Sequence, residues 1–272
     1  MLNLNALCNT LLRGNAMKNI TLFIIFLFSI LQAMAVSAES ISTIKKNGEF
    51  NICAHKNALP FSNEEEATGM HIDLAQLIAD ELRVSLKTSW INLPRYAKFV
   101  KCDAYMGAAI LPGEGEGEGF VKKTNPYAQI EILAITNSKR QLKTLDDFNG
   151  LRVATTSGSL IHMALLKQDT EIFVSHLTDK KILDALINGD VDVGIVANSG
   201  WGWYKKNNSD TTANFHSQST KFINSVNAYQ LGIGFRKADK DTIIEANKIL
   251  YKIKARGDLA KLLDKYGLEP VK

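Results

Sequence analysis

Hydrophobic positions in the first half of the chain form short strand-like runs around one clear helical repeat. Between residues 71 and 82, Ile72, Ala75, Ile78 and Leu82 recur on one face, which predicts an α-helix. Short apolar or alternating runs predict strands on either side of it. These strands cover residues 50–56, 85–91, 102–110 and 131–136.

A second series of the same kind follows. Thr144 is placed to cap a short helix over 145–148 and Gly150 to end it, and further helices are predicted from Gly158–Ser159 and over 179–190. The polar stretch 205–220 is expected to be a surface loop. Two closing helices are predicted within 239–267. Strands are predicted at 151–155, 171–176, 191–197 and 228–235.

Alternating strands and helices predict an α/β fold with mostly parallel sheets, here in two lobes. The chain is expected to cross between the lobes near 130–136 and near 226–232. Residues 39–132 would form the first part of lobe 1, 133–227 lobe 2, and 228–272 the rest of lobe 1. A cleft between two lobes is a common place for a ligand.

The N-terminal 38 residues have the composition of a secretory signal. Lys18 precedes the apolar run of residues 20–31, and small residues follow it up to Ala38. Met17 is an alternative start, and an uncleaved membrane anchor is the alternative interpretation. The run falls short of the roughly 20 apolar residues that span a bilayer, so we expect cleavage after Ala38 and a periplasmic mature protein.

Charge and cysteine content narrow the class of protein. Removing residues 1–38 takes away Arg13, Lys18 and no acid, which leaves 30 basic against 28 acidic side chains and argues against nucleic acid. No later apolar run is long enough to cross a membrane. The two remaining cysteines, Cys53 and Cys102, suggest one disulfide in an oxidising compartment. Two buried thiols or a metal site are the alternatives.

Catalytic signatures are missing from the sequence. There is no GxSxG, HExxH, phosphate loop or nucleotide fingerprint, and the five histidines have no metal-ligand spacing. We therefore expect a binding protein without catalytic residues or a cofactor.

Four segments together resemble family 3 of the periplasmic solute-binding proteins. They are "GMHIDLAQLIADEL" (69–82), "LKTLDDFNGLRVATTSGS" (142–159), "ALINGDVDVGIV" (185–196) and the C-terminal stretch 232–267. The resemblance implies a type II periplasmic-binding-protein (flytrap) fold and a small-molecule ligand in the interlobe cleft. It also implies a monomer that serves an ABC permease.

A narrower resemblance joins "CAHKNALPFSN" (53–63) with "KCDAYMGA" (101–108). Both segments are similar to solute-binding-like accessory proteins encoded with quinoprotein methanol or alcohol dehydrogenases. This resemblance implies that Cys53 and Cys102 are bonded to each other. It also implies a second function, docking on a periplasmic quinoprotein dehydrogenase.

The family places an aromatic side chain and hydroxyl groups against its ligand. By this resemblance Phe61, Trp90 and Ser159 are candidate contacts, together with Ser157. Each has a structural alternative, since lone aromatics are often core residues and serines often cap helices. Asn198 and Trp201, which follow the last strand of lobe 2, are further candidates. Arg95 could hold an anion or lie free on the surface.

Two charged groups of the amino-acid binders are missing. The arginine that grips a carboxylate is replaced by the loop "LPGEGEGEGF" (111–120), and the acid after "VDVGIV" is replaced by Ala197 and its neighbours. We therefore expect a small polar solute that is not an ordinary α-amino acid. The loop's Glu114, Glu116 and Glu118 are open to three interpretations: solvated rim, docking element for a basic partner, or weak cation site.

Overall fold

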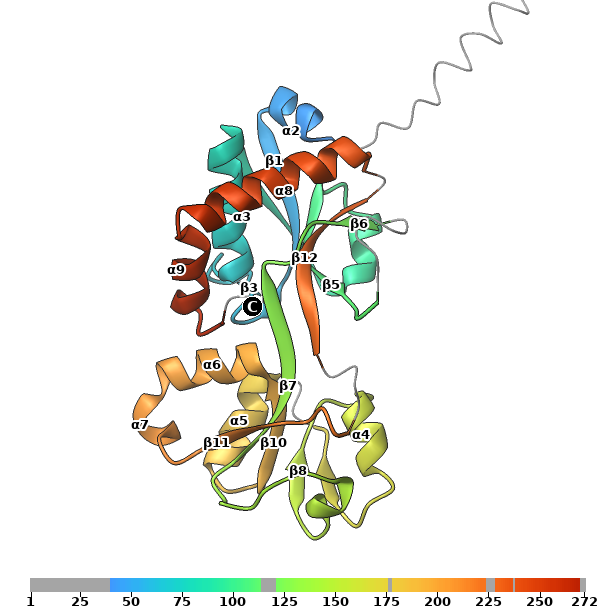
Figure 1. Cartoon of the computed structure of the whole chain (residues 1–272), viewed down its shortest axis with the longest axis vertical. Helices are drawn as coiled ribbons and strands as arrows, with labels where there is room; N and C mark the ends of the chain where they lie inside the picture. The colour runs from blue at the N-terminus through green and yellow to red at the C-terminus, as the bar shows by residue number, and fades with distance from the viewer. Residues whose placement is uncertain (1–39, 114–120, 176–177, 224–227, 237, 270–272) are drawn as a thin grey trace, which may run out of the picture. The chain divides into compact units, whose positions relative to one another are not determined.

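The computed structural model describes residues 40–113, 121–175, 178–223, 228–236 and 238–269. Its strands follow the order β4–β1–β5–β12–β7–β10–β8–β9, with β6 beside β12 and β11 beside β7 (Figure 1). Strands β1, β4 and β5 run parallel in one lobe, and β8, β9 and β10 run parallel in the other. The predicted two-lobed α/β fold is confirmed.

Lobe 1 is built from both ends of the described chain. Its helices are α2 (Ile41–Asn47), α3 (Met70–Leu82), the 3-10 helix η1 (Pro94–Lys98), α8 (Lys240–Ala255) and α9 (Asp258–Lys265). Its strands are β1 (Glu49–His55), β2 (Asn57–Ala58), β3 (Ser62–Asn63), β4 (Ser85–Ile91), β5 (Ala104–Ile110) and β6 (Val121–Lys123). Two longer strands, β7 (Ala128–Thr136) and β12 (Ala228–Arg236), complete it.

Lobe 2 comes from the middle of the chain. Its strands are β8 (Arg152–Ala154), β9 (Glu171–Phe173), β10 (Val193–Ala197) and β11 (His216–Ser219). Its helices are η2 (Leu145–Phe148), α4 (Leu160–Leu165), α5 (Asp179–Ile187), α6 (Asn198–Asn207) and α7 (Ser209–Thr212).

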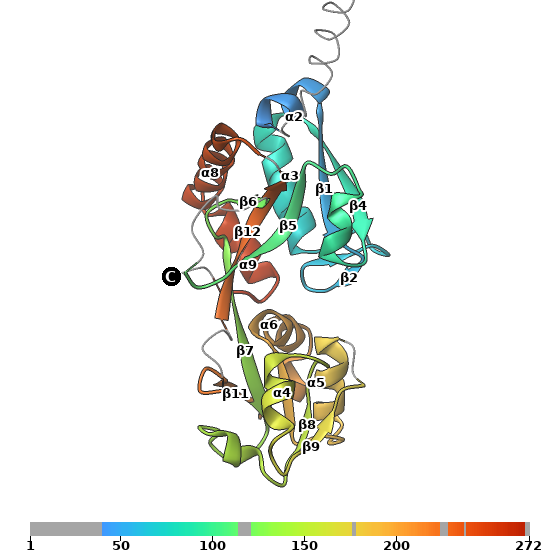
Figure 2. The ribbon, with the colours of Figure 1, turned by 90° about the vertical axis from the view of Figure 1, so that its right-hand side faces the viewer.

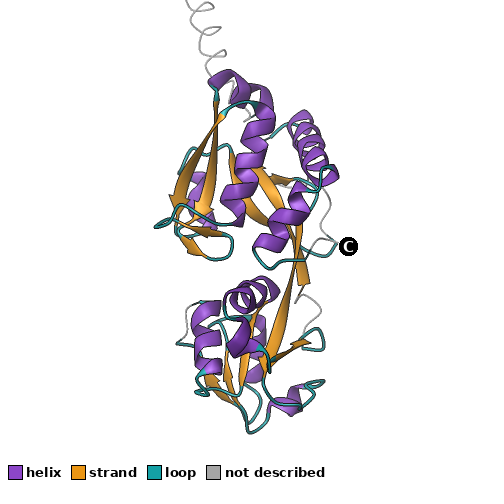
Figure 3. Cartoon of the chain, turned by 90° about the vertical axis from the view of Figure 1, so that its left-hand side faces the viewer, coloured by secondary structure: helices purple, strands orange, loops and turns teal. Residues whose placement is uncertain are grey.

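Helices cover the strands of each lobe (Figures 2 and 3). Each lobe has its own hydrophobic core, because these helices place one apolar face on the strands. In lobe 1, Leu74 and Ile78 of α3 and Ile253 of α8 pack with Phe50 and Ile52 of β1. The buried residues of this cluster lie within 41–130 and 231–268. Those of the lobe 2 clusters lie within 134–204. The lobe boundaries at 132/133 and 227/228 stay predictions, because the hydrophobic clusters show where each core lies but not the residue at which each lobe ends.

Strand β7 belongs to both lobes. Its first half, Ala128–Glu131, pairs antiparallel with β12, and its second half, Ile132–Ile135, pairs antiparallel with β10. Strands β12 and β10 therefore pair with successive halves of β7. The predicted crossing segment 130–136 falls on β7, and residues 228–232 of the other fall on β12, while 226–227 lie outside the described residues.

The prediction of a surface loop over 205–220 was wrong. Helix α6 continues to Asn207, α7 follows, and β11 pairs antiparallel with the second half of β7. The sequence of β11, "HSQS", is polar and has no apolar pattern that predicts a strand. The strand forms because its backbone groups bond to those of β7. Among the residues that the structure describes, no helix is both long enough and apolar enough to span a bilayer.

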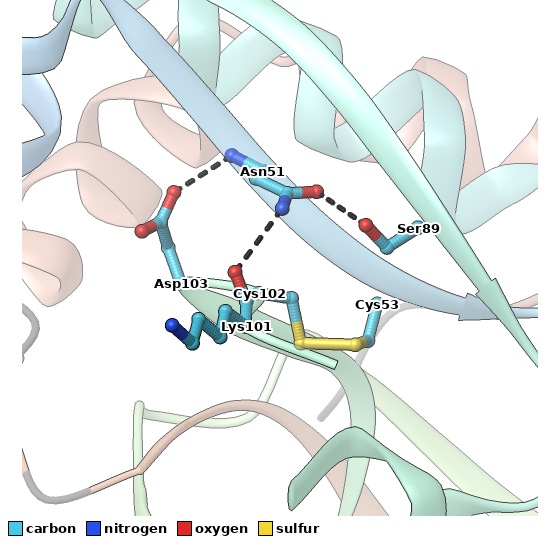
Figure 4. Close-up of a disulfide and its surroundings, with 6 residues drawn as sticks. All are labelled: Asn51, Cys53, Ser89, Lys101, Cys102 and Asp103. Atoms are coloured by element: carbon cyan, nitrogen blue, oxygen red, sulfur yellow. Dashed lines mark hydrogen bonds between the residues drawn. A yellow bond between two sulfur atoms is a disulfide. The ribbon is translucent and has the colours of Figure 1, made fainter. Parts of the chain in front are cut away.

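The Cys53–Cys102 disulfide is present, with Cα atoms 5.6 Å apart and a sequence separation of 49. Cys53 lies within β1, next to the start of β5, and both cysteines are buried. Asn51 reinforces the same place (Figure 4): its backbone N–H donates to Asp103 Oδ2 at 2.7 Å and its side-chain amide to Lys101 O at 3.2 Å. The bond ties two neighbouring parallel strands of lobe 1 together.

Removing this cross-link should destabilise the protein by roughly 3–4 kcal/mol, because the unfolded chain regains the freedom of a loop of about 50 residues. The test compares urea unfolding of the wild type, oxidised and reduced, with that of the double variant Cys53→Ala and Cys102→Ala. Reductant should lower the stability of the wild type and leave the double variant unchanged. Equal stability of oxidised and reduced wild type would contradict the prediction.

Candidate functional site

The candidate site residues gather at the carboxyl ends of the parallel strands in each lobe. In lobe 1, Phe61 lies in the turn between β2 and β3, after β1, and Trp90 lies near the end of β4. In lobe 2, Ser157 and Ser159 follow β8 and Asn198 follows β10. In open α/β sheets ligands bind outside these strand ends, because loops there leave room between the helices. The fold thus brings each group of predicted residues to the edge where a ligand is expected.

In lobe 1 the candidate Phe61 belongs to a compact aromatic and polar group. Its ring stacks on the imidazole of His71 with centroids 4.7 Å apart, and His71 Nε2 lies 2.8 Å from the hydroxyl of Tyr127. A Cβ on Gly107 would lie only 2.5 Å from His71 Cε1, so only glycine leaves room for the ring. The histidine is 6% exposed and fixed from three sides. Sequence analysis missed this pair, which joins α3 to the segment before β7.

Burial determines the charge of this pair. Loss of hydration lowers the pKa of His71 to about 3, so the imidazole is neutral at pH 7. Burial also raises the pKa of Tyr127 well above its ordinary value. His71 and Tyr127 therefore form a hydrogen bond between two neutral groups, and the ring that stacks on Phe61 has no charge.

The other two candidates of lobe 1 differ in exposure. Trp90 is partly buried and packs against the lobe 1 core, so part of its ring surface stays open. Arg95 lies in η1 with an exposed side chain, and its guanidinium stands 5.4 Å from the centre of the Tyr96 ring. The charge of Arg95 thus lies at the surface, over an aromatic ring.

In lobe 2 the serines lie before α4. Ser159 caps this helix by accepting the backbone N–H of His162 at 3.1 Å, and its Oγ lies 3.5 Å from Thr155 Oγ1. Ser157 is exposed two residues earlier. A capping hydroxyl uses its lone pair for the helix and keeps its own proton for another acceptor. Ser159 can therefore cap the helix and donate to a ligand at once.

Asn198 and Trp201 both have structural partners. The Asn198 side chain accepts the N–H of Glu131 at 3.2 Å and that of Ser199 at 2.9 Å, and it donates to Gln129 O at 3.1 Å. Trp201 is 6% exposed and packs in a lobe 2 core. Little of either side chain is left for a ligand, and their binding role stays a prediction.

Asp179, a residue that sequence analysis did not select, lies at the same edge of lobe 2. It is the first residue of α5, and its Oδ2 accepts the N–H of Ala197 at 3.3 Å. Burial raises the pKa of this carboxyl to about 6, although part of the side chain is exposed. The pKa of Tyr229 on β12 is raised by burial and by the nearby Asp179 carboxylate. A helical spacing search could not have found this contact, because 18 residues separate Asp179 from Ala197.

A groove of about 750 Å³ lies beside α6, and two of the candidates, Asn198 and Trp201, line it. Its walls come from α6, α7, β7, β11 and the chain after α9, and include Asn198, Trp201, Lys206 and Asp264. The Lys206 ammonium pairs with Asp264 across it, at 3.1 Å. Phe61, Trp90 and the serines do not line this groove, so we place the candidate site at the strand ends.

The structure does not support a metal site among the residues it describes, since no three acidic, histidine or cysteine side chains there form a metal-binding group. Glu114, Glu116 and Glu118 lie outside the described residues. Their three interpretations stay predictions.

Known proteins resemble this chain over most of its length. The profile of "Bacterial extracellular solute-binding proteins, family 3" matches residues 50–269. Membrane-bound lytic murein transglycosylase F of Alcanivorax borkumensis is 24% identical over 259 residues, which are 90% of this chain and 53% of that protein. The chain thus spans about half the length of this curated relative.

Two solved structures illustrate the fold. The periplasmic binding protein XoxJ from Methylobacterium extorquens AM1 is 22% identical, with 82% of this chain and 99% of that chain covered and a TM-score of 0.62. An ABC uptake transporter substrate-binding protein from Streptococcus pneumoniae, with bound histidine, is 15% identical, with 83% and 94% covered and a TM-score of 0.62. At these identities the likeness establishes the fold.

His71 and Asp179 should give the stability opposite dependences on pH. The folded-state pKa of His71 is depressed, so its protonation in the unfolded chain removes stability as pH falls below about 6.5. The folded-state pKa of Asp179 is raised, so its contribution is present below about pH 4 and lost as pH rises through about 6. Between pH 6.5 and 4.5 each group should change the free energy of unfolding by about 2 kcal/mol, in opposite directions.

Urea unfolding at these two pH values checks both signs. Relative to the wild type, His71→Gln should gain about 2 kcal/mol on going to pH 4.5, and Asp179→Asn should lose about as much. Glutamine keeps a hydrogen-bonding group near Tyr127. A His71→Gln variant with the same pH dependence as the wild type would show that His71 is not buried and neutral.

Proposed function

The chain belongs to family 3 of the bacterial extracellular solute-binding proteins, and from that premise we propose that it captures a small polar solute between its lobes. The single observation that carries the proposal is the placement of Phe61, Trp90 and Ser159 at the carboxyl ends of parallel strands in the two lobes. The aromatic rings offer flat apolar faces and the serine offers a proton. Such a mixture of apolar walls and a few polar groups is typical of small-molecule sites.

The described strand ends offer little to an ordinary α-amino acid. After β5 the described chain continues with Leu111, Pro112 and Gly113, and β10 ends on Ala197. The amide of Asn198, next along the chain, is taken up by β7 and Ser199. A zwitterion bound without a partner for its carboxylate would lose several kcal/mol of hydration. We therefore favour a solute that lacks the adjacent ammonium and carboxylate of an α-amino acid.

We place the protein in the periplasm, exported by residues 1–38 and delivering its solute to an ABC permease. The extracellular family and the apolar segment after Lys18 support this location. The working division of the mature chain is lobe 1 at 39–132 and 228–272, and lobe 2 at 133–227. Closure of two lobes around a hinge is the established way in which this architecture signals occupancy.

Docking on a periplasmic quinoprotein dehydrogenase is the second candidate function. The observation that favours it is the Cys53–Cys102 bond, because the resemblance of segments 53–63 and 101–108 to the dehydrogenase-associated branch implied that pairing. The glutamates of the loop 111–120 would then contact a basic surface of the enzyme.

A thermal-shift screen of the mature protein tests solute capture. We expect one solute class to raise the melting temperature, because a ligand at 100 times its Kd stabilises the folded state by about 2.7 kcal/mol. The panel comprises amino acids, organic acids, sugars, amines, calcium and a lanthanide. Stabilisation by free α-amino acids alone would contradict the expected solute class, and no shift with any solute would contradict solute capture.

The role of Ser159 is tested with the solute that the screen identifies. Ser159→Ala should weaken its binding by about tenfold, the effect of one lost hydrogen bond to a polar group. Thr144→Ala is the matched control, because it removes the cap of η2 in the same lobe without touching the strand ends. Equal loss of affinity in both variants would assign Ser159 to helix capping only.

The docking function is tested by sedimentation of the protein with a purified periplasmic quinoprotein alcohol dehydrogenase. If the loop docks, replacing Glu114, Glu116 and Glu118 by Gln should weaken the complex, and added salt should do the same. Replacing the exposed Asp169, Asp210 and Asp241 by Asn is the control with equal charge change. No complex with the wild type would contradict docking.

A further inference from the structure

The segment that joins β4 to β5, with the 3-10 helix η1 at its centre, packs on the lobe 1 sheet on the side away from α3. Successive residues of a strand point to opposite faces of a sheet. Phe50 of β1 belongs to the core that contains α3, whereas Cys53 of the same strand packs with Ala97 and Val100 of the joining segment. The bond from Cys53 to Cys102 fixes the end of this segment to the sheet (Figure 4).

Three apolar side chains stand out from this segment at three-residue spacing. The N–H of Tyr96 donates to Leu93 O and the N–H of Phe99 donates to Tyr96 O, both at 2.9 Å. Residues three apart in a 3-10 helix lie on the same side, because each turn contains three residues. Leu93 is 40% exposed, Tyr96 39% and Phe99 71%. The segment thus exposes an apolar row, whereas single scattered apolar residues are normal for a protein surface.

The same segment is basic. Residues 92–102 include Arg95, Lys98 and Lys101 and no acidic residue. Arg95 and Lys101 are exposed, and no ion pair within the described part of the chain involves either of them. The carboxylate of Asp103, the next acidic residue, accepts a backbone N–H of β1 at 2.7 Å. Two cations without an ion-pair partner among the described residues therefore accompany the apolar row.

An anionic lipid bilayer fits both features. Leucine and aromatic side chains partition into the boundary between headgroups and acyl chains, while lysine and arginine are attracted to lipid phosphates. A specific protein partner would bury roughly 800 Å² on this side, and lysine is depleted in such interfaces. One short helix with three apolar side chains offers much less area, and a bilayer demands no complementary shape. The observations therefore favour a lipid surface.

We propose that the segment 92–102 seats the protein on an anionic lipid bilayer. Leu93, Tyr96 and Phe99 enter the headgroup region, and Arg95 and Lys101 bind lipid phosphates. The binding is weak and reversible, because three side chains bury little apolar area. It holds the protein at the membrane surface without a membrane-spanning helix. The inference goes beyond the proposed function and does not depend on solute capture.

Co-sedimentation of the mature protein with sucrose-loaded vesicles tests the proposal. Vesicles of equal parts phosphatidylglycerol and phosphatidylcholine should bind the wild type at low ionic strength, and vesicles of phosphatidylcholine alone should not. High salt should release the protein, because counterions screen the attraction between the cations and the lipid phosphates. The comparison of the two vesicle types uses the wild type only, so it does not depend on the folding of any variant.

The apolar row is tested by Phe99→Ser. This change should lower the vesicle partition coefficient by about fivefold, because the most exposed ring of the row no longer leaves water. Met163→Ser is the matched control, since Met163 is an apolar side chain of α4 that is 54% exposed. It should leave the partition coefficient unchanged.

The basic residues are tested by the double variant Arg95→Gln and Lys101→Gln. The loss of two cations at the bilayer should lower the partition coefficient by about tenfold or more. The double variant Lys139→Gln and Lys167→Gln has the same change of charge at exposed positions of lobe 2. It should change the partition coefficient by less than about twofold, because these lysines lie away from the proposed contact.

Three results would overturn the proposal. The first is equal binding of the wild type to both vesicle types, or binding to neither. The second is an equal loss of binding in a test variant and its control. The third is a wild type that ignores the vesicles but sediments with the quinoprotein dehydrogenase only when Arg95 and Lys101 are intact, which would assign the basic segment to an acidic protein partner.

Discussion

The backbone pairing of strand β7 is the constraint on which the rest of the structure depends. One half of the strand pairs with β12 in lobe 1 and the other half with β10 and β11 in lobe 2. Backbone hydrogen bonds do not depend on side-chain identity, so this join places few demands on the sequence. In each lobe, the strands that carry the candidate site residues belong to the sheet that includes part of β7.

Helix α6 provides a second connection, through the packing and hydrogen bonds of its polar and aromatic side chains. Asn198 bonds the start of the helix to two backbone groups of β7. Trp203 packs against the lobe 1 core, with its ring 5.5 Å from that of Tyr266, and Lys206 donates to Asp264 O at 2.6 Å. The segment "GWGWY" is thus occupied mainly by packing, with Trp201 in a core of lobe 2.

The buried or partly buried polar groups His71 and Asp179 differ in charge and in hydrogen bonding. His71 is buried but neutral and bonded to Tyr127, so it costs little beyond its own hydration. Asp179 stands at the start of α5, where the helix end stabilises a carboxylate, and it accepts the Ala197 N–H.

The sequence by itself determined the elements whose signal is local. The apolar face of 71–82, the caps at Thr144 and Ser159, and the strands around 50–56 and 191–197 each depend on neighbours within a few residues, and the structure has them. The pairing of Cys53 with Cys102 was also implied, by resemblance. Tertiary structure alone decided that β11 forms on a polar segment, that Trp201 is buried, and that Asp179 meets Ala197 across Gly200. These depend on contacts between residues far apart in the chain, and periodicity carries no information about which distant groups will meet.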